Sequence, residues 1–308
     1  MRISRLAHVA VGTEGIANLQ AFYEELFGVV QVGRRGELCF LATGRGFGYD
    51  IVLGPWPPGM DHFAFAVADA DSLTQARERL SGAGVEVETV DLEGEHAVAD
   101  GIRFVLPSGH VMELVLPDSS EVYLPRPLVD RRHHQGIGPV FLEHVTMTCG
   151  DVERTANFLV DHLDIKLSES VQPTPGHWFN AFLRSGDRHH DLAFFDSPDG
   201  DVPGLNHFCL AVPSAEQIVR VADLLAARGV TLDSSIGRHI SGNNVFVYFK
   251  DPSGTRIEVN TDMAEIDPAA PPRVMTESLF DAWRTGIPPA VLSSSHCRDG
   301  RGVRAEAR

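Results

Sequence analysis

The sequence contains little cysteine, little positive charge and no long apolar run. Its four cysteines, Cys39, Cys149, Cys209 and Cys297, lie far apart, which suits reduced thiols better than a disulfide framework or a cysteine-based zinc site. The 26 lysines and arginines stand against 42 aspartates and glutamates, and the net charge of -16 repels nucleic-acid backbones and anionic lipid surfaces. No apolar run approaches the ~20 residues that a bilayer span needs. We therefore expect no nucleic-acid partner and no membrane association.

The N-terminal residues also lack the pattern of a secretion signal. A short apolar stretch follows two arginines and runs into Glu14 without a small-residue cleavage site, so we expect the protein to stay in the cytoplasm. The 43% hydrophobic and 22% charged residues are an ordinary globular balance. A chain of 308 residues is long enough for about two domains, each with its own core.

The chain repeats itself. RLAHVAVGTEGIANLQAFYEELFGV, from Arg5, is similar to FLEHVTMTCGDVERTANFLVDHLDI, from Phe141, and both predict a strand, a turn and an amphipathic helix. MDHFAFAVADADSLTQARERLSGAG, from Met60, is likewise similar to LNHFCLAVPSAEQIVRVADLLAARG, from Leu205. A third pair, FVLPSGHVMELVLPD and FKDPSGTRIEVNTDM, predicts two strands joined by a Pro-Ser-Gly turn. Each half therefore predicts two units of strand, helix and several strands.

The spacing of the repeat predicts the domain boundaries. The third pair and the second pair are each offset by 145 residues, but the first pair is offset by 136, so the second half carries a nine-residue insertion. We expect one domain at 1–123, a linker at 124–139 and a second domain at 140–265. The proline-interrupted segment 266–308 reads as a partly disordered tail.

Three potential metal ligands lie on predicted strands of the second half: His144, His207 and Glu258. Their neighbours alternate in polarity, so the three side chains would share one concave face if the strands curl around a cavity. Two imidazoles and one carboxylate leave three adjacent octahedral positions open. That arrangement suits non-haem Fe(II) that must hold a chelating substrate and O2 together.

Further polar residues lie near these candidates: His190, His239, Asn243 and Tyr248. A buried polar side chain needs a partner, so this many of them is costly unless they surround a polar cavity. A histidine can move protons near neutral pH, and a tyrosine can exchange a hydrogen bond with a bound phenolate. The set is therefore typical of a catalytic site.

The segment GRHISGNNVFVYFKDPSGTRIEVN, with His239, Tyr248 and Glu258 spaced by nine and ten residues, resembles the two-domain extradiol catechol dioxygenases of the vicinal-oxygen-chelate superfamily. The resemblance extends over residues 2–263. It implies an α+β fold of four βαβββ modules paired into two barrel-like domains, with the functional metal in the C-terminal one. It also implies Fe(II), or Mn(II) in its place, and a catechol whose ring is cleaved by O2 to a hydroxymuconic-semialdehyde type product.

The same resemblance implies roles for individual residues. The two histidines and the glutamate named above are the metal ligands. His190 is the acid/base, His239 assists the oxygen intermediate, and Tyr248 contacts the substrate oxygens. The adjacent His189 competes for the acid/base role, but the HDLAF context favours His190, so we expect His189 to be a structural or surface residue.

An aromatic segment before His190 predicts part of the substrate wall, because aromatic side chains can sandwich a planar ring. Phe179 fits a core strand equally well, so its role stays open. The residues that we expect around the substrate are Trp178, Phe179, Asn180, Asn243 and Phe246.

The first half carries His8, His62 and Glu113 at positions that match the three ligands. However, the position that matches the tyrosine is Arg103, and the one that matches the acid/base histidine is Tyr49. An arginine beside a metal ion repels it unless the side chain turns away. We therefore expect a vestigial site in the first half.

Two other functions remain open at this point. A non-redox isomerase or lyase of the same superfamily would use a metal only as a Lewis acid, and a metal-free relative would simply bind a small aromatic molecule. The complete set of ligands and neighbouring polar residues favours the dioxygenase. Monocyclic catechols, dihydroxybiphenyls, homoprotocatechuate-like acids and polycyclic diols all fit as substrates, and we expect a homo-oligomer of undetermined order.

Overall fold

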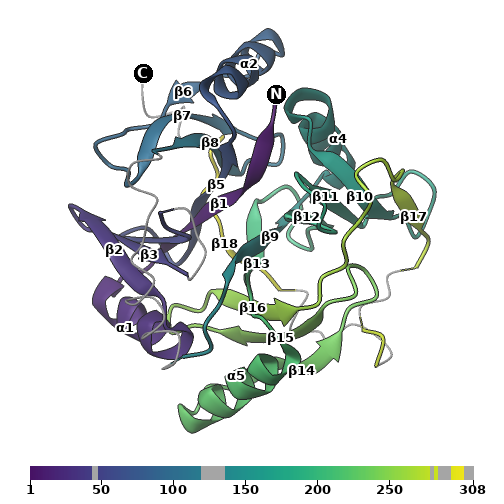
Figure 1. The fold of residues 1–308 in the computed structure, drawn as a ribbon. Coiled ribbons are helices and arrows are strands. Elements are labelled where there is room, and N and C mark those ends of the chain that lie inside the picture. The colour runs from purple at the N-terminus through teal and green to yellow at the C-terminus, as the bar shows by residue number, and fades with distance from the viewer. Residues whose placement is uncertain (44–47, 119–135, 278–280, 284–292, 302–308) are drawn as a thin grey trace.

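Two sheets built from one repeated unit form the protein (Figure 1). The computed structural model describes residues 1–43, 48–118, 136–277, 281–283 and 293–301. These residues form sheets of eight and ten strands together with four helices. The α+β class and the four βαβββ units predicted from the sequence are confirmed.

The first sheet contains two units. Its strand order is β2-β3-β4-β1-β5-β8-β7-β6, so each unit is one half of the sheet and the two meet at β1 and β5. The elements are β1 (Ile3–Gly12), α1 (Ile16–Phe27), β2 (Val30–Arg35), β3 (Leu38–Ala42), β4 (Ile51–Gly54), β5 (Gly59–Val67), α2 (Ala70–Gly82), β6 (Glu88–Thr89), β7 (Val98–Val105) and β8 (Val111–Pro117).

The second sheet repeats this order as β14-β15-β16-β13-β9-β12-β11-β10, with β17 added beside β10 and β18 beside β13. Its elements are β9 (Phe141–Cys149), α4 (Val152–Leu163), β10 (Lys166–Val171), β11 (Asn180–Arg184), β12 (Leu192–Asp196), β13 (Gly204–Ala211), α5 (Ala215–Ala227), β14 (Leu232–Arg238), β15 (Val245–Lys250), β16 (Arg256–Thr261), β17 (Arg273–Met275) and β18 (Ser295–His296).

The central strands of each sheet are buried along their whole length. Every residue of β5 and of β13 is buried, because helices cover one face and the other face closes on the interior of the unit pair. Polar side chains on these strands, such as His62 and His207, are therefore buried as well. The fold thus places potential ligands in a protected interior.

Local sequence signals define where the helices begin and end. Asp69 caps α2 by accepting a hydrogen bond from Ser72 N, and Asp151 caps α4 by accepting one from Arg154 N. Helix α1 ends at Gly28, whose φ of 75° is left-handed and suits a residue without a side chain.

The two halves pack against each other through their helices. Helix α1 lies beside α5, and α2 lies beside α4 (Figure 1). Tyr23 on α1 donates a hydrogen bond of 2.6 Å to Asp251 Oδ2, which follows β15, and both side chains are buried. The Phe27 ring also lies 6.2 Å from the Phe249 ring. The first unit of the chain therefore packs against the last.

The C-terminal tail predicted at 266–308 is joined to both sheets by its described parts. Strand β17 pairs in parallel with β10, and β18 pairs antiparallel with β13. The backbone N–H of Arg298 donates to Met60 O of β5 at 2.9 Å. The remaining parts of this tail at 278–280, 284–292 and 302–308 lie outside the described residues, as does most of the expected linker, so the domain boundaries stay a prediction.

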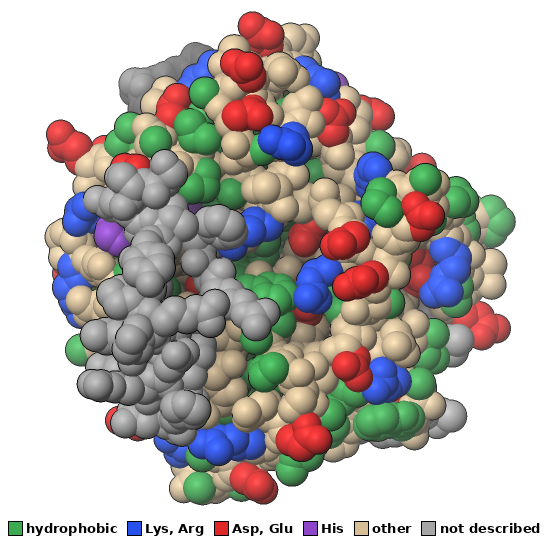
Figure 2. Space-filling model, viewed as in Figure 1, with side chains coloured by type: hydrophobic (Ala, Val, Ile, Leu, Met, Phe, Trp, Pro, Cys, Tyr) green, Lys and Arg blue, Asp and Glu red, His purple; other side chains and the backbone are tan. Residues whose placement is uncertain are grey.

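Two features of the structure concern the cysteines and the helices. All four cysteines are free and buried, as reduced thiols would be. No helix among the described residues is both long enough and apolar enough to cross a bilayer. Acidic and basic side chains are mixed over the face seen in Figure 2.

The Tyr23 contact gives a test of the packing between the halves. Tyr23→Phe leaves a buried carboxylate oxygen without its donor, so we expect the free energy of unfolding to fall by about 1–3 kcal/mol. Chemical denaturation monitored by circular dichroism measures this change. Glu25→Ala, on the exposed side of the same helix, should change stability by less than about 0.5 kcal/mol. Equal effects of the two substitutions would contradict this role of the hydrogen bond.

Candidate metal centre

His144, His207 and Glu258 converge in the interior of the second sheet. His144 Nε2 lies 3.1 Å from His207 Nε2 and 3.1 Å from Glu258 Oε2. His207 Nε2 lies 2.9 Å from the same carboxylate oxygen. All three side chains are buried. The structure therefore brings together two imidazole nitrogens and one carboxylate oxygen from residues that span more than a hundred positions of the sequence, from 144 to 258.

Strand register explains this convergence. Cys209 on β13 lies opposite His144 on β9 and opposite Glu258 on β16, and residues directly opposite each other point to the same face of a sheet. His207 lies two residues before Cys209 and so shares that face. The three adjacent strands thus present their ligands to one point.

The protonation pattern at His207 fits a metal ligand. Its Nδ1 lies 2.7 Å from Asn206 Oδ1, so Nδ1 carries the proton and Nε2 presents a lone pair toward Glu258. A metal-bound histidine usually donates its other N–H to such a partner, which fixes the orientation of the ring. The donor set therefore fits a divalent transition metal, since two nitrogens and one oxygen point at a common centre.

Charge in this site also favours a cation. Burial alone would raise the pKa of the Glu258 carboxyl, but His144 and the neighbouring hydrogen bonds outweigh burial and hold that pKa well below its usual range. Burial would lower the pKa of His144, yet Glu258 and Glu143 raise it to about 9. Burial lowers the pKa of His207 to about 4. A buried carboxylate thus stays ionised and needs positive charge beside it, from a proton or from a metal ion.

His190 lies against the ligands from the segment that precedes β12. Its ring centroid is 4.4 Å from that of His144 and 4.9 Å from that of Phe182. Burial, and then the proximity of His144, lower the pKa of His190 well below its usual value. The imidazole is therefore neutral near pH 7 and able to accept a proton.

His189, expected from the sequence to be a structural or surface residue, lies in the interior. It is buried, and its Nδ1 lies 3.0 Å from His190 Nδ1. Its Nε2 lies 3.7 Å from Glu169 Oε2, and Arg273 Nε of β17 donates to the same oxygen at 2.8 Å. Ser241 donates to the other oxygen of Glu169. His190 is thus backed by a chain of polar side chains.

Sequence reasoning missed Glu169 and Arg273. Glu169 is a buried acid in the otherwise unremarkable strand β10, and Arg273 lies in the tail beyond the internal repeat. No motif or spacing connects these two residues. Only the parallel pairing of β10 with β17, in which they lie opposite each other, brings them into contact.

His239 and Tyr248 form a second group beside the ligands. The His239 ring stacks on Phe246 with centroids 3.8 Å apart and an interplanar angle of 13°. Its Nε2 lies 2.9 Å from the Tyr248 hydroxyl, which donates to Glu258 Oε2 at 3.0 Å. The hydroxyl therefore accepts from His239 and donates to the carboxylate, so the three side chains hold one another in place.

The turn before β15 presents a different asparagine from the one that the sequence favours. Asn243 is exposed, has a left-handed φ of 58°, and uses its carbonyl to accept a hydrogen bond from Arg238. Its neighbour Asn244 is buried, and Asn244 Nδ2 donates to Glu258 Oε1 at 3.0 Å. The conformation of the turn thus directs the second amide inward.

The predicted aromatic wall is partly buried. Trp178 packs against the hydrophobic core, and the Phe179 ring lies 5.9 Å from the Phe195 ring. Asn180 is buried, and its Oδ1 has no hydrogen-bond partner. Asn180 and Phe182 are two residues apart on β11 and so face the same side as His190. This strand therefore supplies an aromatic ring and a free amide oxygen beside the site.

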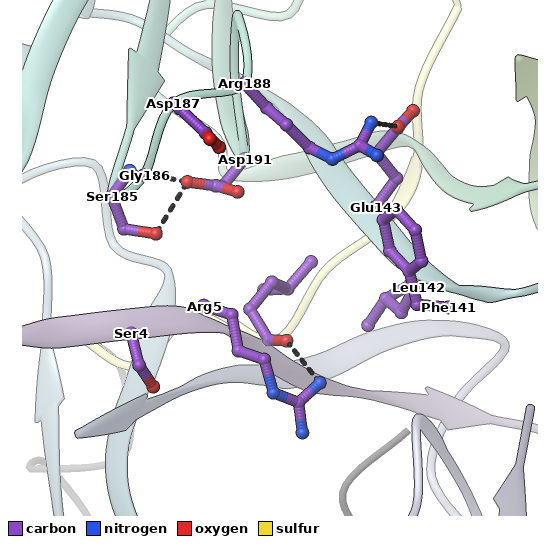
Figure 3. Close-up of a pocket in the computed structure, with 11 residues that line it drawn as sticks. Ser4, Arg5, Phe141, Leu142, Glu143, Ser185, Gly186, Asp187, Arg188 and Asp191 are labelled. Atoms are coloured by element: carbon purple, nitrogen blue, oxygen red, sulfur yellow. Dashed lines mark hydrogen bonds and ion pairs between the residues drawn. The ribbon is translucent and has the colours of Figure 1, made fainter. Parts of the chain in front are cut away.

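A cavity of about 260 Å³ lies between β1 and β9, where the two sheets meet (Figure 3). Arg5 lines it from β1, and Phe141 and Glu143 line it from β9. Arg188 donates to Glu143 Oε1 at one side of this cavity, and Glu143 Oε2 lies 3.7 Å from His144 Nδ1. The interface between the halves thus reaches the back of one ligand.

Asn206 gives a test of the metal centre. Asn206→Leu removes the acceptor for His207 Nδ1, so we expect metal affinity to fall about 10- to 100-fold. Equilibrium dialysis against buffered Mn(II) or anaerobic Fe(II) measures this affinity. Asn206→Asp keeps an acceptor but loses the side-chain N–H that bonds Ser293 O, and it should retain the metal. If both variants lose the same metal affinity, the loss comes from the broken Ser293 contact and not from the missing acceptor for His207.

Comparisons with known proteins agree with this geometry. Residues 141–259 match the model of the Glyoxalase/Bleomycin resistance protein/Dioxygenase superfamily, and residues 60–117 match the Catechol 2,3-dioxygenase-like N-terminal domain.

Two curated relatives resemble the chain over most of its length. A manganese-dependent 2,3-dihydroxybiphenyl 1,2-dioxygenase of Geobacillus genomosp. 3 is 26% identical over 267 residues, which cover 83% of this chain and 84% of the relative. A biphenyl-2,3-diol 1,2-dioxygenase of Paraburkholderia xenovorans (strain LB400) is 28% identical over 280 residues, which cover 87% and 90%.

The fold agrees with that of solved structures. The homoprotocatechuate 2,3-dioxygenase of Brevibacterium fuscum, in an anaerobic substrate complex, superposes with a TM-score of 0.86 at 21% identity, covering 96% of this chain and 93% of that one. The family models and the curated relatives confirm the resemblance inferred from the second-half motif. The match to the Glyoxalase/Bleomycin resistance protein/Dioxygenase superfamily thus covers the second half of the chain, and the two curated relatives that resemble most of its length are extradiol dioxygenases.

Proposed function

We propose that this protein is an extradiol dioxygenase that opens the ring of a catechol beside its two hydroxyl groups. Both atoms of O2 enter the substrate, and the product is of the hydroxymuconic-semialdehyde type. One observation carries the proposal: a buried two-histidine, one-carboxylate set is flanked by the neutral His190 on one side and by the His239–Tyr248 pair on the other.

The proposed metal ligands are His144, His207 and Glu258, whose donor atoms lie close enough together to hold one ion. Three protein ligands would leave coordination positions open for substrate. Fe(II), or Mn(II) in its place, would supply the one-electron chemistry that lets triplet O2 react with a closed-shell catechol. The manganese dependence stated for the Geobacillus relative makes Mn(II) a reasonable alternative.

His190 is the proposed acid/base. Its Nδ1 faces His189 at 3.0 Å, which leaves Nε2 to take a proton from a substrate hydroxyl and to return it later in the reaction. A neutral imidazole suits the first of these steps. His189 and Glu169 hold this ring in position from behind.

His239 and Tyr248 are proposed to bind and orient the reacting oxygens. The stack on Phe246 fixes the plane of His239, and the hydrogen bond to Glu258 fixes the Tyr248 hydroxyl. Positioned donors of this kind stabilise developing negative charge without needing to reorganise. Trp178, Phe179 and Asn180 are proposed to form the substrate wall, with Asn244 rather than Asn243 as the inward amide.

We also propose that the enzyme acts in the cytoplasm as a homo-oligomer. Buried free cysteines suit a reducing compartment. The large apolar side chains of Val202, Val219, Val274 and Trp283 are more than half exposed, and a contact between subunits would remove such surface from water. Light scattering after gel filtration tests the assembly, and a single species of 33.6 kDa would contradict it.

The central experiment is anaerobic reconstitution of the purified protein with Fe(II) or Mn(II), followed by mixing with oxygenated solutions of several catechols. We expect a yellow product and consumption of one O2 per substrate. His207→Ala should abolish both signals, because it removes one of three metal ligands. A protein that holds the metal but consumes no O2 with any catechol would favour a non-redox isomerase or lyase.

His190 gives a prediction that separates chemistry from binding. His190→Asn should keep the metal and bind catechol under anaerobic conditions, but turnover should fall by about 10²- to 10⁴-fold because the acid/base is lost. Absorbance changes report catechol binding, and product colour reports turnover. His177→Asn is the control, since His177 is exposed and pairs with Asp196, and it should keep the parent rate. If His190→Asn turns over at the parent rate, another residue must carry out the proton transfer.

A further inference from the structure

The first sheet holds a second set of two imidazoles and one carboxylate. His8 lies on β1, His62 on β5 and Glu113 on β8. The sequence favours a vestigial site here because of the nearby Arg103. The geometry points to a different conclusion: we propose that His8, His62 and Glu113 bind a second divalent transition-metal ion, which has a structural role and takes no part in ring cleavage.

The three donor atoms have the separations of a metal site. His8 Nε2 lies 3.3 Å from His62 Nε2, and Glu113 Oε2 lies 3.7 Å from the first and 3.6 Å from the second. Ligands about 2.1 Å from one ion and 90–120° apart are separated by about 3.0–3.7 Å. All three side chains are buried. The set is therefore protected from water and of the right size for one ion.

The same strand register builds both sets. Ala64 on β5 lies opposite His8 on β1 and opposite Glu113 on β8, and Ala64 stands where Cys209 stands in the second sheet. The repeat thus conserves the backbone arrangement as well as the residue types.

Glu113 provides an independent sign that something is bound here. Its side chain is fully buried, and its Oε2 has no hydrogen-bond partner although it points toward the two imidazoles. A buried carboxylate oxygen without a partner is costly. A cation among the three donors removes that cost.

His62 is oriented in the way that metal-bound histidines usually are. Its Nδ1 lies 2.8 Å from Asp61 Oδ2, which leaves Nε2 to face Glu113. Asp61 in turn accepts hydrogen bonds of 3.3 Å from Arg298 of the tail. A carboxylate behind a ligand histidine raises the basicity of the ring and fixes its orientation. Asn206 holds the same position before His207 in the other site.

Arg103 does not occupy the centre of this site. It lies opposite Glu113, as Tyr248 lies opposite Glu258, and its Nε donates to Glu113 Oε1 at 2.6 Å. The carboxylate therefore separates the guanidinium from the side on which Oε2 faces the histidines. Asp61 adds a further negative charge beside the site, which offsets the repulsion between an ion and the guanidinium.

The residues around this set do not support oxygen chemistry. Tyr49 stands in place of the acid/base histidine, with its ring 4.8 Å from that of His8, and its hydroxyl donates to Glu95. An ion here would join β1, β5 and β8, the middle of the first sheet (Figure 1).

The test measures how many metal ions each chain binds and does not depend on catalytic activity. His207→Ala protein is stripped with a chelator and titrated with Mn(II), and the free ion is followed by its electron paramagnetic resonance signal. We expect this variant to retain one tightly bound Mn(II) per chain, the parent protein to bind two, and His62→Ala/His207→Ala to bind none. His177→Ala/His207→Ala, which adds a histidine substitution at an exposed position, should still bind one.

Glu113→Gln/His207→Ala is a second variant that is less able to disturb folding, because glutamine keeps the size of the glutamate side chain. We expect this variant to lose the ion and to keep the circular dichroism spectrum of the parent protein. Absence of tight binding in the folded His207→Ala protein would overturn the proposal. Retention of the ion by His62→Ala/His207→Ala would overturn it as well, since the ion would then lie elsewhere. Neither result depends on whether the protein cleaves catechols.

Discussion

An ionised carboxylate buried among imidazoles is the interaction on which the second half of this protein depends. Glu258 lies in the interior on β16, His207 faces it from the neighbouring strand β13, and His144 faces it from β9 on the far side of β13. A charge that has lost its water must be paired, so these strands are held in a register that supplies either a proton or a metal ion. Tyr248 and Asn244 complete the pairing by donating to the same carboxylate.

The internal repeat explains why a similar arrangement occurs twice and why the two differ in chemistry. Both sheets carry two histidines and a glutamate on strands of equivalent register. The surroundings then diverge: His190, the proposed acid/base, and Tyr248, the proposed contact to the substrate oxygens, lie beside the donor set in one sheet, whereas Tyr49 and Arg103 stand in their places in the other. Metal binding needs only the donor set, but ring cleavage also needs a group that can take a proton from the substrate and return it.

The C-terminal tail contributes to both sites through one kind of contact. Arg273 pairs with Glu169, which lies behind His189, and Arg298 pairs with Asp61, which lies behind His62. In each case an arginine from beyond the repeat neutralises a buried acid that faces a histidine. The tail is therefore part of the electrostatic support of the two sites as well as a strand partner for the sheets.

The sequence by itself determined the repeated βαβββ units and the two triads, because alternating apolar residues and equal spacing constrain strand faces and register. It could not determine which asparagine turns inward, since that follows from the left-handed backbone at Asn243. Nor could it determine the burial of His189 or its support by Glu169 and Arg273. Those contacts join segments that share no periodicity, so no sequence pattern predicts them. They form only in the folded chain, because strand pairing removes these charged side chains from water and a buried charge must then be paired.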